Sequence, residues 1–364
     1  MKILRSLLSI GLVLLMAVSV VACHPKNETA ITVGNVKITS SLYLTCLLNA
    51  HSEAMGLVDE TLTENDVITQ ESDYFDKTIE GVNFKQWVKD TALQTALEFA
   101  YVDKLNKEGA FKFSDESKAE AESTAALYWD QYGLSALYEE NGINENTYKQ
   151  SVIYSYMTDE YFLSLYDKGG SKAVNDKTVR EAIINNFESV RKIEGAVSSD
   201  MTETEIESLK KQFEGYYEDL KNGKITFEEL YKKHNNLSDE QIKSMLTKEE
   251  GKEYPNDLYS TVIGGSKTQS KDENFVAIKA MKEGEVKLFE LSNGGYNLIV
   301  RKNIAEEDYY IKNLRSSALH LLKDEEFETY LKEQTKTLNA SVNNYAINNF
   351  KVEKIITANS FQQQ

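Results

Sequence analysis

The sequence predicts a mainly helical α+β fold, in which an α/β segment lies between two helical blocks. Amphipathic helical periodicity dominates residues 83–187 and returns in residues 306–338. Between these blocks, from residue 190 to about residue 304, short β-rich runs alternate with short helical runs. The length of 364 residues allows about two domains. We expect four segments: a leader at 1–22, an N-terminal helical lobe at 23–188, an α/β domain at 189–304, and a helix and strand at 305–364 that return to the helical lobe.

The first residues have the pattern of an export signal. Lys2 and Arg5 precede an uncharged apolar run, Ser6–Val21. This run has 16 residues, fewer than the roughly 20 that span a bilayer, which argues against a retained membrane helix. The sequence Val20-Val21-Ala22-Cys23 resembles the lipobox of bacterial lipoproteins, in which the cysteine is lipidated and becomes the new N-terminus. The resemblance implies a lipid anchor at Cys23 and a location on the extracytoplasmic face of the bacterial cell membrane.

Charge and composition exclude several classes of function. The chain has 58 acidic and 41 basic residues, for a net charge of −17, and removal of the leader changes this charge to about −19. Proteins that bind nucleic acids carry basic patches, so we expect no nucleic-acid partner. The four histidines have no metal-ligand spacing, and we expect neither a metal nor a cofactor. Because Cys23 is the predicted lipidation site, Cys46 has no partner for an intrachain disulfide.

Turn and cap residues predict the N-terminal elements. Gly34-Asn35 lies between two short β-rich runs and predicts a hairpin at Ile31–Ile38. Thr39 and the two serines after it offer N-cap hydroxyls for a helix that continues through Leu48. The acidic residues 57–82 are predicted to form a loop with some helical turns.

The rest of the N-terminal lobe is predicted to be helical, because apolar and aromatic residues recur at helical spacing. Four helices are expected: Asn83–Lys107, a segment from Ser114 to Glu140, Glu145–Tyr166 after an Asn144 N-cap, and Val174–Phe187. Gly169-Gly170-Ser171 separates the last two.

The α/β domain is predicted from short segments in which strand-like and helix-like patterns of apolar residues follow one another. Strands are expected at Val190–Val197, Val286–Leu291 and Tyr296–Arg301. Helices are expected at Thr202–Lys221, Phe227–His234 and Phe275–Met281, and Leu237–Asp272 is expected to be a polar connection. One long helix, Glu306–Leu338, and a strand at Phe350–Ile356 complete the chain.

Three groups of residues in the α/β domain occur in an order that resembles a parvulin domain. The first is a glycine, phenylalanine and leucine element at Gly223, Phe227 and Leu230. The second is a helix that ends in Gly284-Glu285-Val286, and the third is a strand that opens with Gly295-Tyr296. Parvulins are peptidyl-prolyl isomerases, so the resemblance implies a parvulin-like α/β domain.

The segments on either side of this domain resemble extracytoplasmic foldases of the PrsA and SurA type. Gly142-Ile143-Asn144-Glu145 looks like the start of their third N-terminal helix, and Val174-Asn175-Asp176 looks like the helix that leads into the parvulin strand. The hairpin at Ile31–Ile38 looks like their opening strand pair. The resemblance implies a discontinuous, SurA-like helical chaperone lobe, to which residues 305–364 return, with the parvulin-like domain inserted. It also implies a membrane-anchored folding factor. Its partners would be unfolded or newly translocated polypeptides.

The resemblance also places the catalytic positions of a parvulin. Family members use two histidines and a cysteine or aspartate. Here Lys192, or Ile193 if the alignment shifts by one residue, occupies the first histidine position and Asn297 the second, and Asp239 stands at the third. Neither lysine nor asparagine reproduces the donor and acceptor nitrogens of an imidazole. We therefore expect weak or absent isomerase activity, and an active peptidyl-prolyl isomerase with an altered pocket remains the alternative.

The helical lobe is dense in aromatic residues. Spacing of this kind is typical of a buried helix face, but tyrosine and tryptophan also suit the binding of varied unfolded chains. From this set we predict client contacts at Trp129, Tyr132, Tyr156 and Phe162. A solute-binding lipoprotein is the third hypothesis, and it is disfavoured because no two-lobed α/β alternation is visible.

Overall fold

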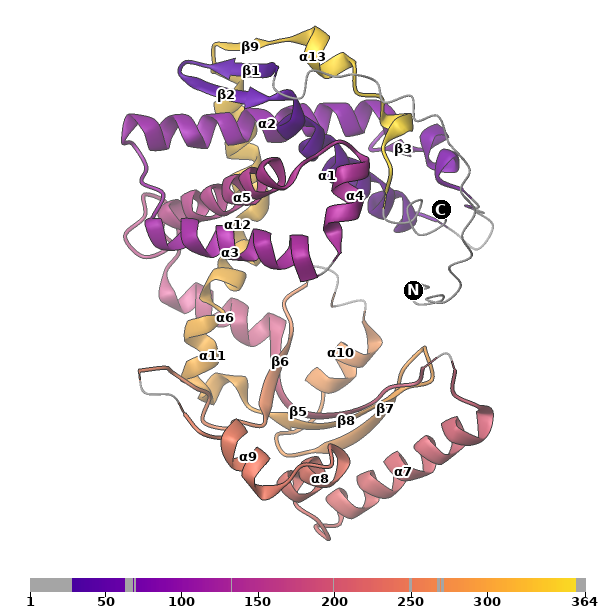
Figure 1. Cartoon of the computed structure of the whole chain (residues 1–364). Helices are drawn as coiled ribbons and strands as arrows, with labels where there is room; N and C mark the ends of the chain where they lie inside the picture. The colour runs from indigo at the N-terminus through magenta and orange to yellow at the C-terminus, as the bar shows by residue number, and fades with distance from the viewer. Residues whose placement is uncertain are drawn as a thin grey trace. The chain divides into compact units, whose positions relative to one another are not determined.

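The computed structural model describes residues 28–357, except residues 63–67, 69, 132, 199, 249, 250, 267, 268, 270 and 271 (Figure 1). The predictions for Cys23 and Tyr132 lie outside the described residues.

The described chain forms two compact units. One unit is Val174–Asp324, which we call the sheet unit. The other combines residues 28–173 with residues 325–357, and we call it the helical unit. The predicted fold class is confirmed: the fold is α+β and mainly helical, and its helical part is built from both ends of the chain.

The two ends of the chain meet in a small sheet of the helical unit. Strands β1 (Thr29–Val33) and β2 (Val36–Thr39) form the predicted hairpin, and Gly34 at its turn has a φ of +57°. Strand β9 (Ala340–Val342) pairs antiparallel with β1, so Ile31 lies opposite Val342 (Figure 1). This pairing joins residues that are about 300 positions apart in sequence, which makes the unit discontinuous.

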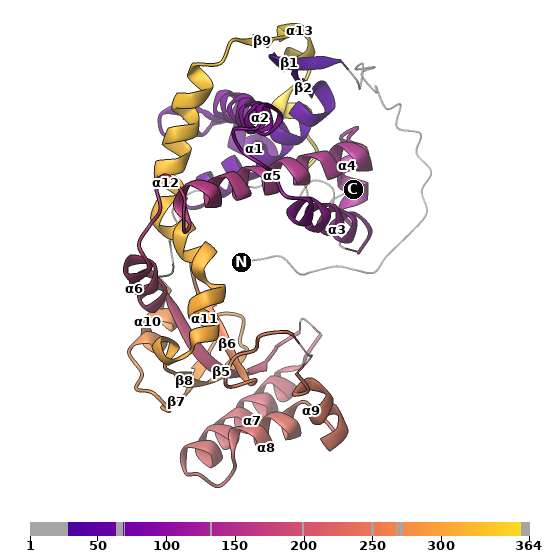
Figure 2. The same ribbon diagram turned by 90° about the vertical axis from the view of Figure 1, so that its left-hand side faces the viewer.

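Three helices of the helical unit begin at side-chain caps. Thr39 and Asn144, which the sequence predicts as caps, accept hydrogen bonds from backbone N–H groups at the starts of α1 and α5, and Asn83 does the same for α2. The helices and their bounds are α1 (Ser40–Asp59), α2 (Phe84–Glu108), α3 (Asp115–Gln131), α4 (Leu134–Glu140), α5 (Glu145–Tyr166) and the second half of α12 (Arg315–Lys336). Figure 2 shows α3 and α5 side by side, as their contacts require.

Four local predictions for the helical unit were wrong in detail. The first helix continues beyond Leu48 to Asp59, because Ala54, Met55 and Val58 are buried and extend its apolar face. Residues 57–82 also contain a 3-10 helix, η1 (Glu71–Asp76), and a hairpin of β3 (Thr78–Ile79) and β4 (Val82–Asn83).

The segment from Ser114 to Glu140 is two helices, since Gly133 adopts a left-handed conformation between α3 and α4. The predicted strand at Phe350–Ile356 is instead a turn of 3-10 helix, η4 (Val352–Lys354), after the short helix α13 (Asn344–Asn348). The strand that pairs with β1 is the earlier segment β9, and residues 350–356 pair with no strand of the described sheet.

The sheet unit contains one antiparallel sheet of four strands in the order β6-β5-β8-β7. The strands are β5 (Phe187–Gly195), β6 (Ser260–Gly264), β7 (Val286–Glu290) and β8 (Tyr296–Lys302). The helices are α6 (Asp176–Asn186), α7 (Glu203–Lys221), α8 (Phe227–His234), α9 (Asp239–Met245), α10 (Glu273–Lys279), η3 (Ile304–Glu306), α11 (Asp308–Asn313) and the first half of α12.

Two predictions for this unit were wrong. The polar stretch Leu237–Asp272 contains helix α9 and strand β6, and β6 forms because it pairs with β5. The single helix expected at Glu306–Leu338 is three pieces: η3, α11 and α12.

Each face of the sheet is covered by its own helices, as Figure 1 shows. On one face Ile193 and Leu298 pack with Phe213 of α7 and Leu230 of α8. On the other face Val190 and Ile299 pack with Ile278 of α10, Met281 and Phe289. Alternation along β5 therefore decides which residues face α10 and which face α7.

Candidate functional site

Lys192 and Asn297 lie on the same face of the sheet, the face that α10 covers. In the register of β5 and β8, Lys192 lies opposite Ile299 and Glu194 lies opposite Asn297. Residues that face each other across an antiparallel pair point to the same side, and Ile299 belongs to the cluster that packs with α10. Asn297 also lies opposite Phe289 of β7, which belongs to the same cluster. The sheet thus brings two of the three predicted catalytic residues to one face.

Neither of these two side chains can do what a histidine does at such a position. The ammonium of Lys192 is 2.8 Å from a carboxylate oxygen of Glu194, so it forms an ion pair with its own strand. Asn297 Oδ1 is buried and accepts no hydrogen bond from any described group. A buried amide oxygen without a donor costs about 1–3 kcal/mol, which an incoming N–H group would recover.

Asp239, the third predicted position, does not join them. It is the first residue of α9, its side chain is 86% exposed, and it forms an ion pair with Lys232 of α8. Within the described part of the chain, no hydrogen bond or ion pair connects Asp239 with Lys192 or Asn297. The three residues therefore do not form one hydrogen-bonded network.

His234 belongs to the opposite face of the sheet. It ends α8, and its Nε2 lies 3.0 Å from the backbone oxygen of Glu194. Its ring packs edge-on against Phe213 and Tyr216 of α7, with centroid separations of 5.5 and 5.9 Å. This histidine is part of the packing between α7 and α8, so it does not supply an imidazole on the face of Asn297.

A charged cluster that sequence reasoning missed lies on this α7 face. Arg191 Nε donates to Asp257 at 2.5 Å, and Arg191 Nη1 is 2.9 Å from Glu228. The guanidinium also stacks near Phe227 and Tyr259. Burial raises the pKa of Asp257, but the hydrogen bond and charge of Arg191 outweigh it and hold that pKa below its usual range. The cluster ties the segment before β6 to the centre of the sheet.

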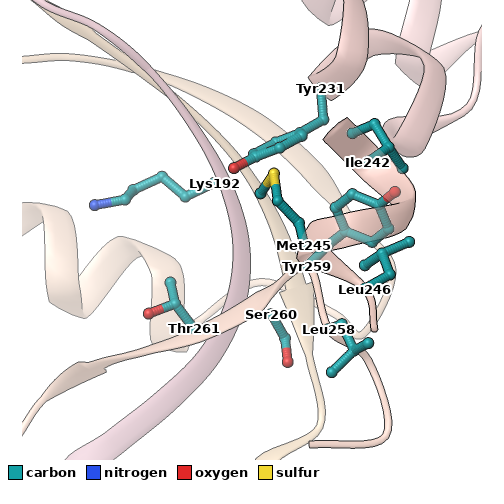
Figure 3. Close-up of a pocket in the computed structure, with 9 residues that line it drawn as sticks. All are labelled: Lys192, Tyr231, Ile242, Met245, Leu246, Leu258, Tyr259, Ser260 and Thr261. Carbon is teal, nitrogen blue, oxygen red and sulfur yellow. The ribbon is translucent and has the colours of Figure 1, made fainter. Parts of the chain in front are cut away.

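A pocket of about 260 Å³ lies at the β6 edge of the sheet (Figure 3). Its lining residues come from β5, α8, the end of α9 and the residues at the start of β6 and just before it: Lys192, Tyr231, Ile242, Met245, Leu246, Leu258, Tyr259, Ser260 and Thr261. Figure 3 shows Met245 between the rings of Tyr231 and Tyr259, while the ammonium of Lys192 points away from Met245. The pocket therefore offers both apolar and polar surface to a ligand.

The predicted client contacts of the helical unit are mostly core residues. Phe162 is fully buried against Tyr166 and Phe327. Trp129 is buried beside Tyr148, at a ring separation of 5.5 Å. A client cannot reach either side chain in this conformation, so their role in client binding stays a prediction.

Tyr156 is partly buried, and its hydroxyl lies 3.0 Å from Thr124 Oγ1. The large apolar side chains that α3 exposes are Leu127 and Tyr128, at 41% and 42%. Sequence reasoning did not choose these two, because helical spacing alone does not tell which face of α3 packs against α5.

Comparisons with known proteins give structural matches alone. No family model matches the chain, and no curated protein matches it. The chain is similar in structure to PrsA foldases. PrsA from Bacillus subtilis is 17% identical, with a TM-score of 0.34 over 68% of this chain and 84% of that chain. Foldase protein PrsA from Streptococcus pneumoniae is 15% identical, with a TM-score of 0.43 over 79% of this chain and 96% of that chain. Foldase protein PrsA from Lactococcus lactis is 13% identical, with a TM-score of 0.36 over 88% and 96%.

Proposed function

We propose that the protein is a membrane-anchored extracytoplasmic folding factor that binds unfolded or newly translocated polypeptides. In this proposal its parvulin-like domain isomerises prolyl bonds weakly or not at all. The observation that carries the proposal is the sheet face with Lys192 and Asn297, where family members have two histidines. No hydrogen bond joins Lys192 and Asn297 in the described part of the chain, so the polar network of an isomerase has no counterpart between them.

The loss of catalysis follows from the barrier to the reaction. An uncatalysed prolyl flip crosses about 18–20 kcal/mol and takes tens to hundreds of seconds, so a useful catalyst must hold the peptide bond in an organised pocket. Lys192 is engaged by Glu194, and Asn297 Oδ1 has no donor among the described groups. Neither side chain fixes the orientation of the other through a hydrogen bond.

The location in this proposal rests on the leader and Cys23. In the region that the structure describes, no helix is both long and apolar enough to cross a bilayer. The lipid anchor would hold a body of about −19 charge, which an anionic membrane surface repels.

Two assays on the chain from residue 24 onward test the function. We expect the protein to suppress aggregation of a refolding client at a near-stoichiometric ratio. In a protease-coupled assay with a proline-containing peptide, we expect isomerisation within about twofold of the uncatalysed rate. Asn297→Ala is expected to change neither result.

Two outcomes would replace this proposal. Rapid isomerisation that Asn297→Ala abolishes would establish the active isomerase. Absence of aggregation suppression, together with a thermal shift on addition of small molecules, would favour a solute-binding lipoprotein. The double variant K192H/N297H is a useful companion, because a gain of isomerisation there would show that the missing imidazoles limit the rate.

A further inference from the structure

Strand β6 is an edge of the sheet, and part of its backbone is unpaired. The N–H of Gly265 donates to the backbone oxygen of Asn186 at 2.9 Å. Hydrogen-bonded and non-hydrogen-bonded residue pairs alternate along an antiparallel ladder, so the N–H and C=O groups of Thr261 and Ile263 point toward β5. Val262 therefore directs its N–H and C=O away from the sheet, and no described group bonds to either of them. One strand position on this edge thus has both hydrogen-bonding groups available.

The other outward-facing residue at the start of this edge, Ser260, already has hydrogen-bond partners. Ser260 N–H donates to Asp257 O at 3.0 Å, and Ser260 O accepts from the Tyr310 hydroxyl at 2.8 Å. The unpaired part of the edge is thus limited to the second half of β6. This part begins next to the pocket.

The two edges of this sheet differ in how they are protected. Strand β7, at the far edge, has the sequence VKLFE and exposes Lys287 and Glu290. Charged residues of this kind prevent another strand from pairing. Strand β6 has the sequence STVIG, with three β-branched residues in succession and no charge. In a chain that is 27% charged, the uncharged edge is the one that fits an added strand.

The pocket lies beside this uncharged edge. Ser260 and Thr261 belong both to β6 and to the pocket lining. Met245, which is 54% exposed, stands in the pocket, and its flexible thioether adapts to side chains of different shape. The volume of about 260 Å³ is just below the 300–1,000 Å³ range of small-molecule sites and suits one or two apolar side chains.

We propose that an extended segment of an unfolded polypeptide adds to β6 as a fifth strand and places an apolar side chain in the pocket. This inference deepens the proposed function, and it rests on it. Backbone hydrogen bonds to Val262 would give affinity for many sequences, and the pocket would add a preference for one apolar side chain next to the paired segment. The occupant must be a polypeptide, because a strand edge is satisfied by alternating N–H and C=O groups.

The test uses a fluorescein-labelled, end-blocked ten-residue peptide of alternating valine and threonine with one central leucine. Binding is measured by fluorescence anisotropy on the chain from residue 24 onward. Thr261→Lys places a charged side chain on β6, like Lys287 on β7. Val262→Pro removes the N–H that points away from the sheet and removes no hydrogen bond between β5 and β6. We expect each to weaken binding at least tenfold. Lys287→Thr on the opposite edge is the matched control, and we expect it to leave binding unchanged.

A change in the peptide provides a second test that does not depend on folding of the variants. N-methylation of alternate residues along one side of the peptide removes its donors, and we expect at least tenfold weaker binding to the unmodified protein. Equal binding by N-methylated and plain peptides would overturn the inference. So would a Thr261→Lys variant that binds like the unmodified protein and has an unchanged melting temperature.

Two further outcomes separate this inference from the proposed function. If Thr261→Lys still suppresses client aggregation fully and binds the peptide normally, the folding function stands and the β6 site does not. A concentration-dependent dimer that Thr261→Lys dissociates, without peptide binding, would show that a second copy of this chain pairs with β6 and would overturn the inference.

Discussion

The ion pair between Glu188 and Arg301 provides the sharpest stability prediction. Glu188 is 1% exposed, and Arg301 Nε and Nη2 are both 2.9 Å from the same carboxylate oxygen. Arg301 Nη1 also donates to Met281 O at 2.5 Å, at the end of the segment that covers this face. Replacement by Arg301→Met keeps the aliphatic volume and leaves the buried carboxylate without its partner.

The expected cost follows from the burial of the carboxylate. Removal of one partner of a buried pair costs about 3–5 kcal/mol, and the partial exposure of Arg301 reduces this figure to about 2–4 kcal/mol. For a unit of this size, such a loss lowers the melting temperature by roughly 4–16 °C. The double variant E188Q/R301M removes the uncompensated charge, so we expect it to recover at least half of the loss.

The position of the tryptophans permits a clean assay. Trp87 and Trp129 both lie in the helical unit, so tryptophan fluorescence reports that unit alone. Amide hydrogen exchange of peptides from β5 and β8 reports the sheet unit. We expect Arg301→Met to accelerate exchange in β5 and β8 and to leave the fluorescence transition in denaturant unchanged. Unchanged exchange in β5 and β8 would refute the assignment of this pair as a stabilising contact.

Three further predictions concern other contacts. Gly195→Ala places a methyl carbon 2.5 Å from the buried ring of Phe213. We expect the stability of the sheet unit to fall by about 1–3 kcal/mol, as measured by amide hydrogen exchange in β5. Unchanged exchange would mean that the ring moves to make room. Burial lowers the pKa of His51 to about 4, below its unfolded value of about 6.5. Because the unfolded chain then takes up a proton before the folded chain does, stability should fall as pH decreases from 6.5 to 4. Urea midpoints that stay constant over this range would contradict the prediction. The hydroxyl of Tyr330 lies 2.9 Å from that of Tyr161, and Tyr330→Phe should lower the stability of the helical unit by about 1 kcal/mol, as measured by tryptophan fluorescence in denaturant.

Local sequence signals were sufficient for elements whose caps and periodicity agree. Helix α5 spans Glu145–Tyr166 as predicted, because Asn144 accepts from Thr147 N and the apolar face repeats with helical spacing. Helix α8 likewise spans Phe227–His234 after the cap at Thr226. These features depend on residues within a few positions of one another.

Local sequence signals could not predict which distant segments pair. The sequence STVIG of β6 lies in a polar region and becomes a strand because β5 bonds to it. Residues 350–356 have strand-like composition, but β1 pairs with Ala340–Val342 instead. In both cases a backbone partner far away in sequence decides the conformation.

The candidate site divides in the same way. The sequence by itself pointed to Lys192 and Asn297 as candidate site residues, because residue identity and order are local facts. It also determined the mainly helical α+β class through periodicity. Only the tertiary structure decided that these two residues share a sheet face while Asp239 is exposed on α9. It also decided that Phe162 is buried and that an uncharged strand edge lies beside a pocket, because burial and strand order depend on which distant segments pack together.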